Sequence, residues 1–119
     1  MNALEKAELL KERSKQFAIR IVAVVRSLPT TREGNVVGNQ LLRSGTAVAA
    51  NYRAVCRARS RAEFISKMSI VVEEADETVF WLELLSESGL VKPAKLVELL
   101  SEANQLLAIF AASRRTARE

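Results

Sequence analysis

Apolar residues recur three and four positions apart along most of the chain, which is the spacing of a helix with one buried stripe. This pattern predicts a first helix over residues 4–27 and then a break at LPTTREG, where proline and glycine interrupt the periodicity. It predicts a second helix over residues 36–58, whose buried stripe includes Tyr52 and Cys56. The first half of the chain is therefore expected to fold as two helices joined by a short loop.

The second half of the chain continues the pattern with clear start and stop signals. SRAE has the spacing of a capping box, in which Ser60 accepts from a free helix amide and Glu63 reaches back. A third helix is predicted over residues 61–87, with Gly89 as a left-handed stop. Pro93 suits the first turn of a fourth helix that fades into the polar tail SRRTARE. Four helices with short joints predict an all-α fold, an antiparallel up-down-up-down four-helix bundle, as one domain over residues 1–119.

Composition agrees with a helical protein and excludes several kinds of chemistry. Four glycines and two prolines in 119 residues leave helix-forming residues dominant. There is no histidine and only one cysteine, which excludes histidine-based catalytic and metal sites and an internal disulfide. No apolar run approaches the roughly 20 residues that span a bilayer, and the charged first residues are unlike a secretory signal. We expect a cytoplasmic protein without a membrane partner.

Two of the predicted helices carry more apolar or small surface than one buried face needs. The second has a line of alanines behind its buried stripe, where a monomer normally carries long polar side chains. The third has apolar residues outside its main stripe. One interpretation is a broad contact within the core, and the other, which we favour, is an interface between subunits of a homo-oligomer. The residues concerned are Ala47, Ala50, Ala54, Ala58, Ile70, Trp81 and Leu84.

The predicted hairpin of the second and third helices also places one arginine opposite acidic residues. Residues that are equally far from the turn at Ser60 come level with each other in such a hairpin. Arg43 then lies near Asp76 and Glu77. We expect a structural ion pair there, of the exposed kind that contributes about 0 to 1 kcal/mol.

Basic residues gather at one end of the predicted bundle, where the second and fourth helices end and the first and third begin. Helix dipoles account for cations at the two C-termini but not for those in the first turns of the other two helices. A polyanion site accounts for both, whereas the alternative is a solvated charged face. We call this end the basic pole. Its candidate nucleic-acid-binding residues are Arg53, Arg57, Arg59, Arg61, Lys67, Arg114, Arg115 and Arg118, with Lys6, Lys11, Arg13 and Lys15 beside them.

The arginines of the basic pole are expected to lack acidic partners, because the one acid facing them, Glu63, is assigned to the helix cap. Contacts to phosphates rather than to bases are expected. Most of the few aromatic residues, Tyr52, Phe64 and Phe80 among them, fall on or beside buried stripes, so the sequence predicts no stacking platform.

The acidic run EEADE, residues 73–77, is the one pattern that suggests an enzyme. Three of its glutamates could hold a hard cation such as Mg²⁺, and the run is similar to the first metal motif of all-helical nucleoside triphosphate pyrophosphohydrolases. Those enzymes need a second acidic motif, and the fourth helix offers only the widely spaced Glu98 and Glu102. Cys56 lacks the neighbouring base of a catalytic thiol. We therefore expect no catalytic residue, no metal and no other cofactor.

The longest motifs indicate a family. GNQLLRSGTAVAANYRAVCRARSRAEFISKM followed by EEADETVFWLELL resembles the bacterial four-helix-bundle proteins encoded by intervening sequences in 23S ribosomal RNA genes. The pattern EAxxLxxIFxAS over residues 102–113 extends the resemblance through the fourth helix. The resemblance implies an antiparallel bundle, a ring-like homopentamer and no established catalytic activity. The family pattern has glutamate where this chain has Ala54, which leaves the nearby arginines one fewer acid.

A more distant group in this resemblance is the basic accessory proteins of diversity-generating retroelements, which bind reverse transcriptase and nucleic acid. Residues and resemblance together predict a non-enzymatic oligomeric scaffold that binds the phosphate backbone of RNA or DNA. The alternative is a protein-interaction hub, in which the ring recruits a partner protein and the arginines form ion pairs with it. A remote alternative is a magnesium-dependent nucleoside triphosphate pyrophosphohydrolase.

Overall fold

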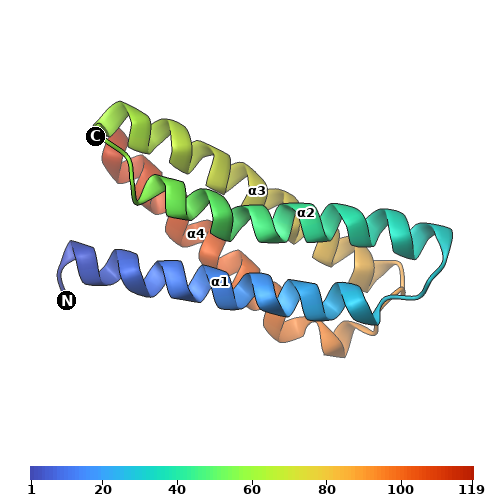
Figure 1. Ribbon diagram of the computed structural model, residues 1–119. Coiled ribbons are helices and arrows are strands. Elements are labelled where there is room, and N and C mark those ends of the chain that lie inside the picture. The colour runs from blue at the N-terminus through green and yellow to red at the C-terminus, as the bar shows by residue number, and fades with distance from the viewer.

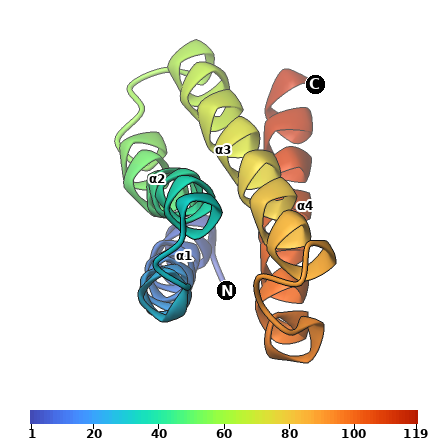
Figure 2. The ribbon, with the colours of Figure 1, turned by 90° about the vertical axis from the view of Figure 1, so that its right-hand side faces the viewer.

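The computed structural model describes all 119 residues, which form four long helices and no strand (Figure 1). The helices run alternately in opposite directions, and each packs against the next along the chain (Figure 2). The predicted all-α antiparallel four-helix bundle is confirmed. No helix combines the length and the apolarity needed to cross a membrane. The elements are α1 (Ala3–Ser27), α2 (Arg32–Val55), α3 (Arg61–Glu87), the 3₁₀ turn η1 (Pro93–Lys95) and α4 (Val97–Arg118).

Side-chain caps begin three of the helices. Asn2, Thr31 and Ser60 each accept a hydrogen bond from the amide three residues later, at 2.8, 3.1 and 3.0 Å. Such caps satisfy amides that have no partner within the helix. The cap at Thr31 starts α2 four residues before the start that the apolar pattern predicts, because its first turn, REGN, is polar.

Three other helix ends differ from the expected ones. α2 ends at Val55 rather than at residue 58, because the chain must reverse over residues 56–60 before Ser60 caps α3. Pro93 begins η1, and α4 starts only at Val97. α4 continues through the polar tail, where basic residues in the last turn complement the helix dipole. Gly89 has a φ of 78°, which confirms the left-handed stop after α3.

The core is a cluster of 19 buried apolar residues drawn from all four helices. The rings of Tyr52 on α2 and Phe110 on α4 pack with centroids 5.3 Å apart, across the bundle. Every buried side-chain polar atom has a partner. Cys56 is exposed, contrary to its predicted place on the buried stripe, because α2 ends before it.

A close approach of α1 and α2 occurs at Gly45. A Cβ atom on Gly45 would lie 2.8 Å from both Cγ atoms of Ile21, a separation that real side chains do not adopt. Ile21 is fully buried, so it has no free space into which it could move. The missing side chain of Gly45 therefore sets how closely the two helices pack.

We expect Gly45→Ala to lower the free energy of unfolding by about 1 to 3 kcal/mol, because the new methyl group overpacks the contact with Ile21. Gly38→Ala is the matched control. Its methyl group would meet the end of the half-buried Leu28 side chain at 3.0 Å, which can yield, so the gain in helix propensity leaves it neutral or stabilised. Urea unfolding followed by circular dichroism measures both variants. Equal stabilities would contradict this role of Gly45.

Candidate nucleic-acid interface at the basic pole

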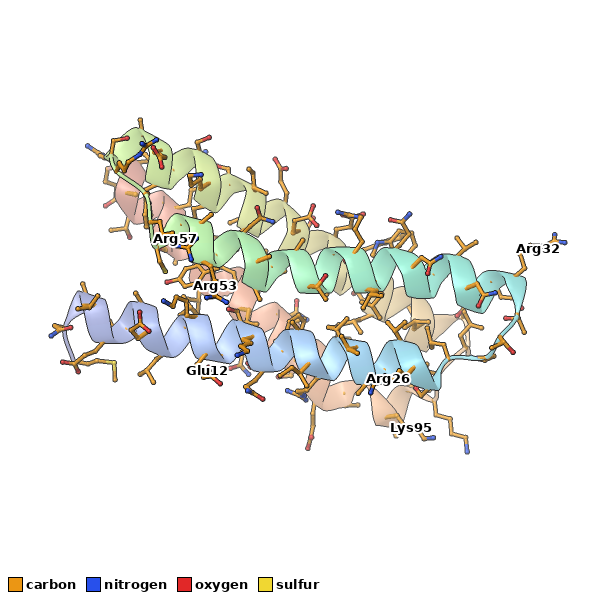
Figure 3. All side chains as sticks on the ribbon, in the orientation of Figure 1. Glu12, Arg26, Arg32, Arg53, Arg57 and Lys95 are labelled. Carbon is orange, nitrogen blue, oxygen red and sulfur yellow. The ribbon has the colours of Figure 1, made fainter.

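The fold brings the predicted basic residues to one end of the molecule. Both chain termini and the connection from α2 to α3 lie there (Figure 1). Figure 3 shows Arg53 and Arg57 at this end, whereas Arg26, Arg32 and Lys95 lie at the other. The up-down order of the helices thus assembles the basic pole from segments that are far apart in sequence.

Most candidate residues of the basic pole have no protein partner for their charge. Four are exposed and two are half-buried, and none forms an ion pair or a side-chain hydrogen bond. Long cationic side chains without partners are free to contact an external anion. These residues are Arg53, Arg57, Lys67, Arg114, Arg115 and Arg118.

The prediction that Arg59 has no acidic partner is wrong. Its Nε atom lies 3.5 Å from Glu63 Oε2, one helical turn away. The Glu63 side chain was assigned to a capping box, but only the half made by the Ser60 hydroxyl forms. The side chain of Arg59 is still 87% exposed, so its pairing is loose.

Arg61 also has a partner, but a neutral one. Its Nε donates to the main-chain carbonyl oxygen of Ala117 near the end of α4. This bond ties the start of α3 to the end of α4 and satisfies a carbonyl that the helix leaves free. The rest of the guanidinium keeps its donors and its charge.

Two acids from α1 that lie near the basic pole are engaged by their own helix. Lys11 Nζ lies 2.9 Å from Glu8 Oε1, and Gln16 Nε2 donates to Glu12 Oε1 at 2.9 Å. The carboxylates of these two acids therefore contact side chains of α1 itself. Arg53 forms no ion pair with either of them.

A groove between α1 and α2 lies beside Arg53. It has a volume of about 460 Å³, and the small residues Ala49 and Ala50 leave room for it. Lys15 lies on its α1 side and forms no ion pair. The groove is also lined by Lys11 and by the acids Glu8 and Glu12, so basic and acidic side chains both face it.

Arg13, one of the basic residues beside the candidates of the basic pole, has a carboxylate partner. Its Nε and Nη2 atoms donate to the two carboxylate oxygens of Glu102 at 2.8 and 2.7 Å, and Nη2 also donates to Gln105 Oε1 at 2.9 Å. This bidentate pair joins α1 to α4, the neighbours with the least extensive contact. The hydrogen bond from Arg13 lowers the pKa of Glu102.

Arg43 forms the predicted structural ion pair, but with partly different acids. Its guanidinium contacts Glu74 Oε2 at 2.9 Å and also Glu77. Asp76 is exposed and forms no ion pair. Residues 74 and 77 are three apart and share the face of α3 that meets α2, whereas position 76 points elsewhere.

The acidic run does not form a metal centre. Two of its glutamates are held by Arg43, and the chain has no group of three or more histidine, cysteine, aspartate or glutamate residues that could hold a metal ion. The structure therefore offers no favourable observation for the pyrophosphohydrolase alternative, whose chemistry requires such a group.

The predicted alanine line is only partly a feature of α2. Ala47 and Ala54 are half-buried on the helix, and Ala50 is exposed and lines the groove beside Arg53. Ala58 lies beyond the end of α2, in the turn before α3. The line is therefore one residue shorter than predicted, because the helix stops at Val55.

The apolar residues of α3 outside its buried stripe are at the surface, as an interface requires. Ile70 is 44% exposed and Leu84 is 36% exposed, while Trp81 is half-buried. Phe80 was placed on or beside the buried stripe, but it is 53% exposed and packs edge-on against Trp81, with centroids 4.9 Å apart. We call Ile70, Phe80, Trp81 and Leu84 the outer apolar face of α3.

Known proteins match the chain over most of its length. The family model described as 23S rRNA-intervening sequence protein matches residues 7–112. A crystal structure of a protein with unknown function from the S23 ribosomal protein family of Bacteroides thetaiotaomicron is 33% identical, with a TM-score of 0.84. The alignment covers 92% of this chain and 98% of that one. No match was found among curated proteins.

The ion pair between α1 and α4 predicts a pH-dependent stability. Glu102→Gln should lower the free energy of unfolding near neutral pH by about 1 kcal/mol, because the carboxylate pairs with Arg13. The folded-state pKa of Glu102 lies below its ordinary value of 4.5, so this contribution is complete above 4.5 and is lost as the pH falls through the lower folded-state pKa.

Urea unfolding of wild type and variant, near neutral pH and at about pH 3, measures the effect. The two curves should converge in acid. Glu98→Gln is the control, because Glu98 is an exposed glutamate of α4 without an ion pair. A Glu102→Gln difference of the same size at both pH values would contradict the role of this carboxylate.

Proposed function

The chain belongs to the family of 23S rRNA-intervening sequence proteins, and we propose that it is a non-enzymatic oligomeric scaffold that binds RNA or DNA through phosphate contacts at its basic pole. The observation that carries this proposal is that more basic than acidic side chains at the pole lack a partner. Glu8, Glu12 and Glu63 are each held by a neighbouring side chain, which leaves Glu5 and Glu119 as unpaired acids against six basic residues without a partner at the same pole. Free guanidinium and ammonium groups are the donors that phosphate oxygens accept from.

The basic residues favour contact with the backbone of the nucleic acid over reading of its sequence. They come from the end of α2, the turn after it, the first half of α3 and the end of α4, so no single helix presents a row of side chains to a groove. Arginine and lysine on such ends reach phosphates in many orientations. Binding of this kind is independent of sequence and depends steeply on salt.

Assembly into an oligomer, which we also propose, would support the same function. The outer apolar face of α3 is exposed in one chain, and burial against other copies would remove it from water. The homopentamer that the family resemblance implies would repeat the basic pole around a ring. Several poles on one strand raise the apparent affinity without any new kind of contact.

The protein-interaction hub is the second candidate, and the exposed Phe80 and Leu84 favour it. A partner protein could cover these residues in place of a second copy, while its acids pair with the arginines. The two candidates differ in what the basic pole retains: a nucleic acid in the first and an acidic protein in the second.

A charge reversal at the basic pole tests the phosphate contacts. We expect Arg53→Glu with Arg57→Glu to weaken binding of a labelled RNA or DNA strand on the order of tenfold or more at about 100 mM salt. The slope of log K against log salt should also fall by about 1.5, because two phosphate contacts are lost. Fluorescence anisotropy at several salt concentrations gives both quantities.

The matched control is Arg26→Glu with Arg32→Glu, which changes the net charge equally but at the other end of the bundle (Figure 3). Both control residues are exposed. This variant should retain most of the affinity. Equal losses in the two double variants would mean that only net charge matters, and undiminished binding by the Arg53 and Arg57 variant would refute the proposal.

The outer apolar face predicts the effect of one substitution on assembly. Ile70→Glu should shift the protein from oligomer to monomer, because a charge would be buried in the interface. Ile19→Glu makes the same change at a 51% exposed isoleucine of α1, outside the proposed interface, and should leave the oligomer intact. Sedimentation velocity measures the mass of each. An unchanged oligomer in the Ile70 variant would place the interface elsewhere.

A further inference from the structure

An apolar hollow of about 560 Å³ lies within the basic pole. It is lined by the starts of α1 and α3, the ends of α2 and α4, and the turn between α2 and α3, so all four helices contribute to it. Leu4 on its rim is 72% exposed, which shows that the hollow opens to solvent. Its larger lining residues are Leu4, Tyr52, Val55, Cys56, Arg61 and Phe64.

Small residues keep this space open. Alanines occupy the places where the four helix ends meet, namely Ala3 and Ala7 on α1, Ala58 in the turn and Ala117 on α4. The bond from Arg61 to the Ala117 carbonyl holds the end of α4 beside the start of α3. Most of the wall therefore comes from helix ends, and the turn over residues 56–60 supplies the rest.

The chemistry of the hollow combines flat apolar surface with positive charge. Phe64 is half-buried and presents aromatic surface to the hollow, whereas Tyr52 is almost fully buried against Phe110, so little of its ring is open to a ligand. Burial raises the pKa of Tyr52 above its ordinary value. Arg61 lies in the wall itself, and Arg57 and Arg59 belong to the same turn as the lining residues Cys56 and Ala58.

A ligand that fits must present an apolar, flat group next to negative charge. A nucleotide of a single strand has this form, because its base carries a π-face and its phosphates lie on either side. A base in a duplex is stacked between neighbours and must be extruded before it can enter such a space. The hollow alone would suit many apolar groups, but the surrounding arginines favour one that is flanked by phosphates.

We propose that the hollow binds an unpaired base of the RNA or DNA strand whose phosphates contact the arginines of the basic pole. This inference rests on the proposed function and specifies its ligand as a single-stranded or unpaired segment. Contacts to the phosphates supply affinity that is independent of sequence. Binding of the base supplies a preference for unpaired over paired nucleic acid.

A variant that fills the hollow tests the preference. Ala7→Phe places a ring in the space, and Ala23→Phe adds the same ring at an exposed site of α1 that is remote from it. We expect Ala7→Phe to weaken binding of a single strand about tenfold, the size of one lost stacking contact, and to leave duplex binding unchanged. Ala23→Phe should change neither. Unchanged single-strand binding by a folded Ala7→Phe protein would overturn the inference.

Cys56 gives a second readout that needs no variant, because it is the only cysteine, is exposed and lines the hollow. A single-stranded oligonucleotide should slow its alkylation by iodoacetamide, and an abasic strand with the same number of phosphates should not. Equal protection by both strands, in a protein that binds them, overturns the unpaired-base inference and leaves phosphate binding standing. No binding of either strand at low salt refutes the proposed function and this inference together. Protection by an acidic protein but by no nucleic acid would assign the hollow to a partner protein instead.

Discussion

The reversal of the chain between α2 and α3 is the constraint on which the basic pole depends. Ser60 caps α3 with a 3.0 Å hydrogen bond, and Gly45 allows α2 to lie close against α1. The alternating direction of the helices then brings two helix starts and two helix ends to one end of the bundle (Figure 1). Arginines that are separated along the sequence therefore share one surface, and the alanines between them leave a hollow there.

The fold follows from the sequence because helical periodicity is local, whereas the contacts between helices are not. Apolar spacing within each segment predicted the four helices. Equal distances from the turn at Ser60 placed Arg43 opposite the acidic run. The prediction chose Asp76 in place of Glu74, because counting from the turn gives the level along α3 but not the side of the helix, and these two positions are about 200° apart around it. The Arg13–Glu102 pair joins the first and last helices, whose register no local pattern fixes.

The candidate site was predictable in its charges but not in its shape. Up-down topology was enough to gather the arginines, while the exposure of Cys56 depends on where α2 stops. The hollow forms only where all four helix ends meet, so no local sequence motif predicts it. The outer apolar face lies along the middle and end of α3, away from the pole. None of the four residues of that face lines the hollow or the groove, whereas Ala50 and Ala58 of the predicted interface do.

Salt-dependent binding by the wild-type protein tests the central claim most directly, because phosphate contact is the property that the basic pole is proposed to supply. The protein would be titrated against labelled single strands and duplexes of RNA and DNA, by fluorescence anisotropy, from about 50 to 200 mM salt. The account predicts binding whose affinity falls by orders of magnitude over this range, with single strands held more tightly than duplexes. The absence of binding to every nucleic acid at the lowest salt would contradict it.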